Sequence, residues 1–350
     1  MKRCRLELVW FLGAGLVASC PALAAPPAPR APASHGTLVK LATLVPDGTV
    51  WYKTLVDLGD EWSSETQGRV TLRIYPGGVA GEEQDMVRKM RIGQIQASAL
   101  TVLGLASVDE SFDVFATPMM FGSYDELLYV LDKMTPVLKQ RLEAKGFVLL
   151  NWGHAGWLQV FTKQPVQSVS DLKKLKIFVG AGDDRMVQMW KDNGFQPVAL
   201  AVTDLLTSLQ TGMIDALPST PLIALQLQWF RMTPYMVDTG LAPLVGGLVI
   251  TRQAWNKIPE ADRAKLLEAC KRAEAKLQAE IPLQDKNAVA EMEKRGLKVT
   301  HIQGQAAVEW RAMAERFAGR MRGTMVPAEI VDQALRERDA YRRRGSASSP

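Results

Sequence analysis

The sequence predicts an α/β fold made of two units with a cleft between them. Its 350 residues exceed the usual length of one domain, which is about 150 residues, so two units are expected. The composition, 47% hydrophobic and 23% charged, is that of a folded globular chain. Short runs of β-forming residues alternate with segments at helical spacing, which favours a parallel or mixed sheet with functional loops at the strand ends.

The first unit opens with a strand and a helix. Residues 38–44 alternate and are rich in β-forming residues, which predicts a strand. Hydrophobic residues recur at helical spacing over 51–62, after a break at Pro46-Asp47-Gly48, which predicts a helix. The same signals predict the rest of this unit, with strands at 70–75, 97–102 and 147–152 and helices at 86–92 and 124–145.

The second unit repeats this rhythm after a glycine-rich crossover at 153–157. Strands are predicted at 158–162, 175–179 and 197–199, helices at 183–193 and 202–211, and a returning strand at 245–251. A long charged amphipathic helix is predicted at 261–294, and Pro282 inside it predicts a kink near residue 281. A brief strand at 299–302 and two arginine-rich helices complete the chain.

The net charge of +5 is concentrated at the two ends of the chain. The first 24 residues carry +2, and residues 311–350 carry nine Arg against five acids, or +4. Subtraction, 5 − 2 − 4, leaves about −1 for the body. A body of this charge argues against a nucleic-acid partner, and we expect none.

The N-terminus has the three parts of a secretory signal peptide over residues 1–24. A short basic segment precedes the apolar run 8–18, and Ala22-Leu23-Ala24 forms a small-x-small cleavage site. The apolar run is shorter than the ~20 residues that span a bilayer. We therefore expect a periplasmic protein, with an Ala/Pro-rich disordered spacer at 25–37. The sequence before Cys20 also fits a lipoprotein cleavage box, so lipidation at Cys20 is the alternative.

Cys270 is the one cysteine in the sequence after the predicted signal peptide. It lies on an apolar helix face with Leu266, Leu277 and Ile281, which predicts a buried packing residue. The body is therefore expected to have no internal disulfide and to depend on core burial for its stability.

Several stretches resemble the DctP-type solute-binding proteins of TRAP transporters. In the N-terminal part they are LATLVP at 41–46, TQGRV at 66–70, YPGG at 75–78, GEE at 81–83 and VRK at 87–89. Further on they are DLKKLKI at 171–177, LQTGMID at 209–215 and AWNKIP at 254–259. The resemblance extends from about residue 38 to about residue 320.

The resemblance implies a two-domain periplasmic binding protein, type II-like, that traps a small organic ligand in the interdomain cleft and delivers it to TRAP membrane subunits. It implies a long helix that spans both domains. The expected domains are 38–157 with 246–302, and 158–245, followed by C-terminal helices and a basic tail at 303–350. The second hypothesis is a ligand-binding sensor, or a protein that works with a periplasmic helical-repeat adaptor, without direct transport.

Two arginines that the resemblance leads us to expect are absent. Most members of this family carry an arginine after the Leu-Lys-Ile strand, where its planar fork pairs with a substrate carboxylate, and here that position is Phe178. The second would follow a glycine at the crossover, which reads Gly156-Trp157-Leu158. Because a buried carboxylate without a cation is costly, the sequence favours an arginine-less branch with a largely hydrophobic ligand.

Aromatic and small polar residues are the candidates for the ligand site. The predicted ligand-binding residues are Trp51, Trp152, His154, Trp157, Phe178, Asp183, Ser219, Thr220 and Trp229. Trp190 fits the core and the cleft equally well. Arg185 is the candidate for a relocated cation that would hold a carboxylate, against its alternative as a solvated helix residue. Asp183 and Asp184 have a second interpretation as a helix cap.

Catalytic chemistry is not indicated by the sequence. Only three histidines occur, at positions 35, 154 and 301, and no G-x-S-x-G or phosphate-loop motif is present. We therefore expect no enzyme activity, no cofactor and no metal site.

Overall fold

The structure is a computed structural model that describes residues 36–347. The predicted signal peptide, the lipidation at Cys20 and the predicted spacer up to residue 35 lie outside the described residues. The first strand begins at Thr37, the last residue assigned to the spacer. Residues 36–347 form one compact unit by their contacts.

Strands and helices alternate through most of the chain, as predicted. The strands are β1 Thr37–Thr43, β2 Val70–Tyr75, β3 Ala97–Thr101, β4 Phe147–Thr162, β5 Lys176–Gly180, β6 Gln196–Leu200, β7 Ala216–Ser219, β8 Tyr235–Thr251 and β9 Lys298–His301. The longer helices are α1 Val50–Glu65, α2 Glu83–Arg91, α4 Tyr124–Ala144, α6 Asp184–Asp192, α10 Glu260–Lys294, α11 Gly304–Met321 and α12 Ala328–Ala347. The shorter ones are α3 Val102–Ala106, α5 Val169–Leu172, α7 Leu205–Gln210, α8 Pro221–Gln226 and α9 Arg252–Lys257, with the 3₁₀ helix η1 at Glu110–Ala116.

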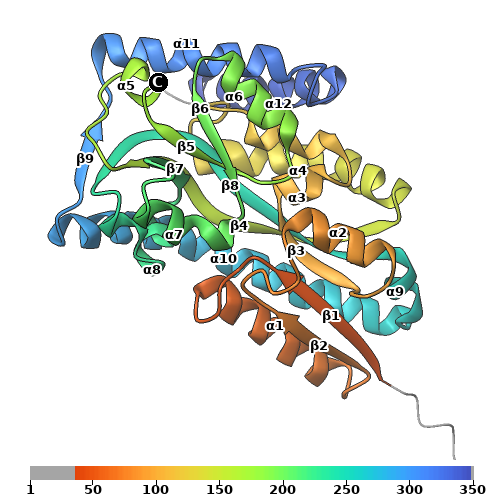
Figure 1. Ribbon diagram of the computed structural model, residues 1–350. Helices are drawn as coiled ribbons and strands as arrows, with labels where there is room; N and C mark the ends of the chain where they lie inside the picture. The colour runs from red at the N-terminus through yellow and green to blue at the C-terminus, as the bar shows by residue number, and fades with distance from the viewer. Residues whose placement is uncertain (1–35, 348–350) are drawn as a thin grey trace, which may run out of the picture. The chain divides into compact units, whose positions relative to one another are not determined.

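All the strands of the described chain belong to one mixed sheet. Their order is β2-β1-β3-β8-β4-β7-β5-β6, and β9 pairs with β8. The outer pairs β1/β2 and β5/β6 are parallel, whereas β8 runs antiparallel to β3 and β4. The α/β class with a mixed sheet is thus confirmed, and β4 and β8 connect its two halves (Figure 1).

The crossover is the place where the sequence prediction was wrong. A glycine-rich crossover at 153–157 was predicted to separate two strands, but β4 continues through it as one strand to Thr162. Similarly, β8 begins at Tyr235, well before the predicted start at 245. Pairing of β4 with β8 satisfies the backbone hydrogen-bonding groups of this segment. Register shifts, such as the one between His154 and Trp157, accommodate the glycine-rich sequence within the strand. Strand β7 and the short helices α3, α5, α8 and α9 were not predicted.

The long helix α10 lies against both halves of the sheet. It packs on α1, β4 and α8, and Figure 1 shows it running behind the sheet from α9 to β9. Its Asp285 carboxylate accepts hydrogen bonds from the backbone N–H of Trp157 in β4 (3.1 Å) and of Leu222 in α8 (2.9 Å). The helix continues through Pro282. Cys270 is fully buried as predicted, and burial raises the pKa of its thiol to about 12.

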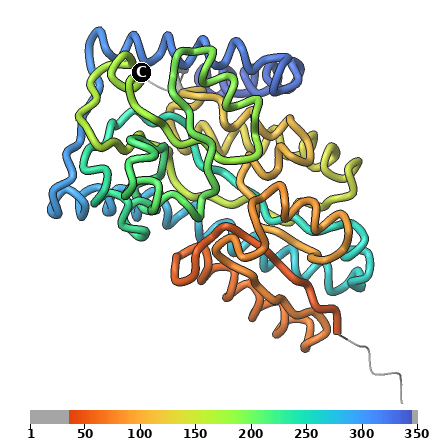
Figure 2. Tube along the Cα trace, viewed as in Figure 1, coloured from red at the N-terminus to blue at the C-terminus, as the bar shows by residue number. Residues whose placement is uncertain are grey.

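The C-terminal helices pack on the part of the body farthest from β1, α1 and β2 in the view of Figure 2. Helix α12 packs against α4, where the Arg342 guanidinium donates to the buried Glu126 carboxylate at 2.6 Å. The basic end of the chain is therefore partly a structural contact, since Glu126 would otherwise be a buried acid without a cation.

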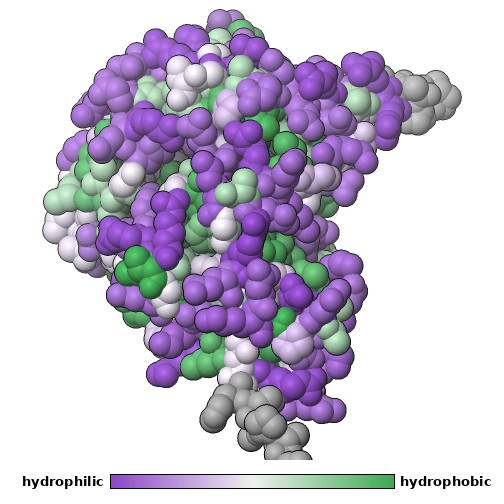
Figure 3. Space-filling view, turned by 90° about the vertical axis from the view of Figure 1, so that its right-hand side faces the viewer, coloured by the Kyte–Doolittle hydropathy of each residue, from purple (hydrophilic) through white to green (hydrophobic). Residues whose placement is uncertain are grey.

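The surface is mostly polar on the face shown in Figure 3, where hydrophobic side chains appear mainly in the gaps between hydrophilic ones. Within residues 36–347, no helix combines the length and the apolar character needed to cross a bilayer.

Candidate functional site

A cavity of about 480 Å³ lies at the junction of the two halves of the sheet. Its walls come from the loop before α1, from α1 itself, from β3, β4, β5 and β8, and from α6, α10 and α11. Segments that are far apart in the sequence therefore meet there. This size is in the range of cavities that hold small organic ligands, about 300–1,000 Å³.

Five large aromatic side chains contribute to the walls. They are Trp51 from α1, Phe178 from β5, Trp190 from α6, Trp229 from the 3₁₀ helix after α8 and Phe317 from α11. The indole N–H of Trp51 donates to the backbone carbonyl of His154 at 2.9 Å, which fixes the ring against β4. Flat aromatic walls of this kind fit apolar or ring-bearing ligands.

The ionisable residues of the lining are two acids and one histidine. Among the described residues that line the cavity there is no lysine and no arginine; the titratable ones are Glu82, Glu83 and His154. Burial lowers the pKa of His154 to about 4, so this imidazole is neutral at neutral pH. Within residues 36–347, no group of three or more His, Cys, Asp or Glu side chains is arranged to hold a metal ion.

Glu83 is the first residue of α2, and its buried carboxylate reaches Thr101, the residue before α3. One oxygen accepts from the backbone N–H of Thr101 and the other from the hydroxyl of the same residue, each at 2.6 Å. Burial raises the pKa of Glu83 despite these bonds, and burial also raises the pKa of Glu82. A negatively charged ligand would meet both acids in a cavity whose described lining offers no lysine or arginine.

Five of the predicted ligand-binding residues line this cavity. They are Trp51, His154, Phe178, Ser219 and Trp229. The structure therefore brings together residues from α1, β4, β5, β7 and the segment after α8, and Ser219 lies at the end of β7 with its hydroxyl donating to the carbonyl of Thr220.

Trp152 and Trp157 do not line the cavity. Trp152 is absent from the lining, and its ring packs on Phe112 and Phe115. The Trp157 ring packs edge-on against Tyr124. Both tryptophans were placed in the cleft because each stood at the end of a predicted strand, with Gly153 and Gly156 between them.

Two polar candidates cap helices outside the cavity lining. The Asp183 carboxylate accepts from the backbone N–H of Met186 at 3.0 Å, which is the cap that the sequence offered as its second interpretation. The Thr220 hydroxyl accepts from the N–H of Ile223 at the start of α8. Arg185 also lies outside the lining, and its guanidinium pairs with the exposed Glu110 at 3.1 Å.

Sequence reasoning missed Glu82, Glu83 and Asn151 as lining residues. The two glutamates stood in the GEE stretch used for the resemblance, but nothing local indicated that α2 begins at the cavity wall. Asn151 lies within the predicted strand 147–152, where its side chain could have been assigned to a face only with the true extent of β4. Trp190, which the sequence assigned to neither side, lines the cavity and packs on Phe195 and Phe317.

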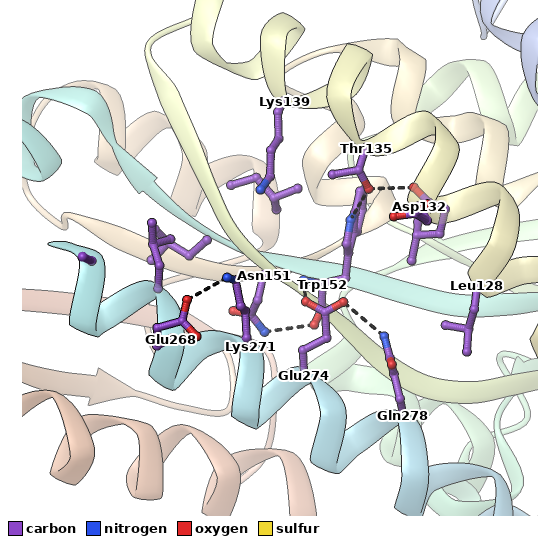
Figure 4. A pocket seen from close by; sticks show the side chains of 15 residues that line it. Leu128, Asp132, Thr135, Lys139, Asn151, Trp152, Glu268, Lys271, Glu274 and Gln278 are labelled. Carbon is purple, nitrogen blue, oxygen red and sulfur yellow. Dashed lines mark hydrogen bonds and ion pairs between the residues drawn. The ribbon is translucent and has the colours of Figure 1, made fainter.

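A second hollow of about 700 Å³ lies on the other side of β4, between α4 and α10. Its lining is charged and polar, as Figure 4 shows, and includes Asp132, Lys139, Glu268, Lys271 and Glu274. Lys271 pairs with Glu268 at 2.7 Å. Because small organic ligands favour mostly apolar cavities with a few polar groups, the aromatic cavity is the better candidate for the ligand site.

Known proteins give a consistent comparison. The family model of bacterial extracellular solute-binding proteins, family 7 (DctP), matches residues 41–322. A solute-binding protein of Chromohalobacter salexigens is 23% identical over 262 residues, covering 73% of this chain and 77% of its own length. The C4-dicarboxylate-binding periplasmic protein DctP of Rhodobacter capsulatus is 23% identical over 265 residues, covering 75% and 76%.

A solved structure shows the same fold. DctP7 of Bordetella pertussis, an extracytoplasmic solute receptor binding pyroglutamic acid, superimposes with a TM-score of 0.80 at 20% identity, covering 87% of this chain and all of its own. Together with the match over residues 41–322, this fold likeness makes the chain a member of extracellular solute-binding protein family 7, the DctP-type periplasmic receptors of TRAP transporters, which are solute-binding proteins and not enzymes.

Proposed function

We propose that this protein is a TRAP solute receptor for a small, largely hydrophobic organic ligand without an ionised carboxylate. The observation that carries the proposal is the lining of the 480 Å³ cavity, which contains five large aromatic rings, two glutamates and no lysine or arginine among the described residues. A carboxylate would lose its hydration there without gaining a cation, a cost of several kcal/mol.

The relatives make this a departure within the family. The Bordetella pertussis receptor binds pyroglutamic acid, and the Rhodobacter capsulatus protein is a C4-dicarboxylate-binding protein, so both take acids. In this chain Phe178 lines the cavity at the position where the family arginine was expected, and Arg185 is engaged with Glu110. The proposal rests on this exchange of a cation for an aromatic ring.

Delivery would follow domain closure. In this proposal residues 38–157 with 246–302 form one domain and 158–245 the other, and the ligand is enclosed when they close. Export by the signal peptide at 1–24 would place the protein in the periplasm beside the membrane subunits. Lipidation at Cys20 is the alternative route to the same compartment.

Identification of the bound molecule tests the proposal directly. The full-length protein would be purified without denaturation, measured by native mass spectrometry, and its ligand released and identified. We expect an apolar molecule without a carboxylate. A tightly bound C4-dicarboxylate, present at one per chain, would overturn the proposal.

A gain-of-charge variant tests the same point from the other side. Phe178→Arg restores a guanidinium at the cavity wall, and we expect D-glucuronate or pyroglutamate to bind about tenfold or more tightly than to the wild type, since one charged hydrogen-bonded pair contributes about 1.5–3 kcal/mol. Ala199→Arg is the matched control, because it adds the same charge at an exposed position of the neighbouring strand β6. Equal carboxylate affinity in the two variants would contradict the assignment of Phe178.

A further inference from the structure

A chain of hydrogen bonds leads from the ligand cavity to the hollow between α4 and α10. The Nε2 atom of His154, which lines the cavity, lies 3.3 Å from Nε2 of Gln278. The same Gln278 nitrogen donates to Oε1 of Glu274 at 3.1 Å, and Oε2 of Glu274 accepts from the backbone N–H of Trp152 at 3.0 Å. Glu274, Gln278 and Trp152 are drawn together in Figure 4.

The direction of each hydrogen bond in this series follows from the Glu274 carboxylate at its end. Glu274 accepts at both oxygens, so it requires the amide NH₂ of Gln278, not its carbonyl, on the facing side. The second proton of that NH₂ is then directed at Nε2 of His154. A ring nitrogen that receives a proton donor must carry a lone pair, so the single proton of the neutral imidazole resides on Nδ1.

The Nδ1 atom is the end of the chain. It has no hydrogen-bond partner among the described residues, and the backbone of the same residue is held by the Trp51 indole at its carbonyl. His154 is 3% exposed and lines the cavity, and its Nδ1 atom is not among the fully buried side-chain atoms that lack a partner, so this N–H borders open space. A donor in so enclosed a position is stabilised when a ligand offers it an acceptor.

We propose that Glu274 and Gln278 are positioning residues that hold His154 in the Nδ1–H tautomer, so that the cavity selects an uncharged ligand with an acceptor oxygen, such as a ketone or ester carbonyl. This inference rests on the proposed function and narrows its ligand class. Glu82 and Glu83 disfavour an anionic acceptor in the same cavity, because neither has a cation beside it in the lining. The apolar body of the ligand would lie against the aromatic walls.

Nitrogen NMR of histidine tests the tautomer without any ligand. The chain has three histidines, at positions 35, 154 and 301, so selective ¹⁵N-histidine labelling yields few signals, and His154→Gln identifies the one that matters. We expect the wild-type protein at neutral pH to show a neutral His154 with its proton on Nδ1. A proton on Nε2, or a charged ring, would overturn the inference and leave the proposed function standing.

A matched pair of variants separates this role from general effects on α10. Gln278→Leu removes the donor to His154, and we expect a mixture of the two tautomers. Gln284→Leu breaks an equivalent Gln–Glu bond on the same helix, from Gln284 to Glu280 at 3.3 Å, and should leave the His154 signal unchanged. If both variants leave the tautomer unchanged, the positioning role is wrong.

Four one-ring probes test the ligand class by calorimetry: acetophenone, ethylbenzene, benzylamine and benzoate. We expect acetophenone to bind about two- to tenfold more tightly than ethylbenzene, the effect of one neutral hydrogen bond, and Gln278→Leu to reduce this preference. Equal binding of these two, or tightest binding of benzylamine, would overturn this inference alone. Tightest binding of benzoate, or binding of none, would overturn the proposed function as well.

Discussion

The ligand cavity and the hollow between α4 and α10 lie on two sides of the same strand, β4, and have opposite chemistry. The cavity is walled by aromatic and aliphatic side chains with no basic residue among the described lining. The hollow holds two lysines and three acids. Asn151 borders both spaces, so a single strand separates an apolar environment from a charged one.

The difference shows how burial decides which charges a protein keeps. In the hollow, Glu268 and Lys271 remain paired and partly exposed to solvent, where an ion pair needs little protection. In the cavity, Glu83 is buried and is kept by hydrogen bonds from Thr101. A binding site lined by acids and aromatic rings, with no lysine or arginine, favours a different ligand from a site that contains an arginine.

The largest effects are expected from replacing two tryptophans, one at the cavity and one at the hollow. Trp51 donates its indole N–H to His154 in the cavity wall, and Trp152 donates to the Thr135 hydroxyl in the hollow, both at 2.9 Å. Each Trp→Ala change should cost about 3–5 kcal/mol of unfolding free energy, measured by urea denaturation, because both rings are buried.

Of the two positions, only Trp51 should matter for ligand binding. Trp51→Phe keeps a ring and should retain the fold with weakened affinity, whereas Trp152→Phe should leave affinity unchanged in the same calorimetric assay. Loss of affinity in Trp152→Phe alone would mean that the ligand occupies the hollow.

An effect of intermediate size on stability is expected from Asp113 in η1. This buried acid lines neither the cavity nor the hollow. Neither of its carboxylate oxygens has a hydrogen-bond partner among the described residues, and burial, with Asp183 nearby, raises its pKa to about 7. The folded state therefore binds this proton more tightly than the unfolded state, in which the pKa is the ordinary 3.8. Stability from this group is present below that ordinary pKa and is lost as the pH rises through about 7.

The Asp113→Asn change should remove this loss of stability at high pH. Urea unfolding should show a gain of about 1–3 kcal/mol at about pH 8 and little change at acidic pH. The control is Asp132→Asn, which removes an exposed carboxylate from the rim of the hollow and should change stability equally at both pH values. A pH-independent effect of Asp113→Asn would contradict the buried, protonated carboxyl.

The smallest effect is expected from Lys139, whose side chain extends into the hollow in Figure 4. No hydrogen bond or ion pair ties its amino group to the described residues, so Lys139→Ala should change the unfolding free energy by no more than about 0.5 kcal/mol and leave ligand affinity as it is. A clear loss of affinity would show that the hollow takes part in binding.

Most elements could be predicted because their signals are local. The helix 261–294 was predicted from periodic apolar residues and is observed as Glu260–Lys294, and the strand 70–75 is observed as predicted. Strand β4 could not be predicted in full, since the glycines at 153 and 156 favour a turn unless β8 is present to pair with them.

The site was predicted in part for the same reason. Phe178 was placed by its resemblance to a family position, and Trp51 by its position after the first loop, and both line the cavity. Trp152 was misplaced because the face of a side chain on a strand depends on where the strand starts and how it pairs.

By itself, the sequence determined the α/β rhythm, the long helix and the family, since each depends on residues close together in the chain or on words in a fixed order. The tertiary structure alone decided that Glu82, Glu83 and His154 share one apolar cavity, and that Gln278 lies behind the histidine. These residues come from segments at least 71 positions apart in the sequence (154 − 83 = 71), and the pairing of β4 with β8 and the packing of α10 bring them together.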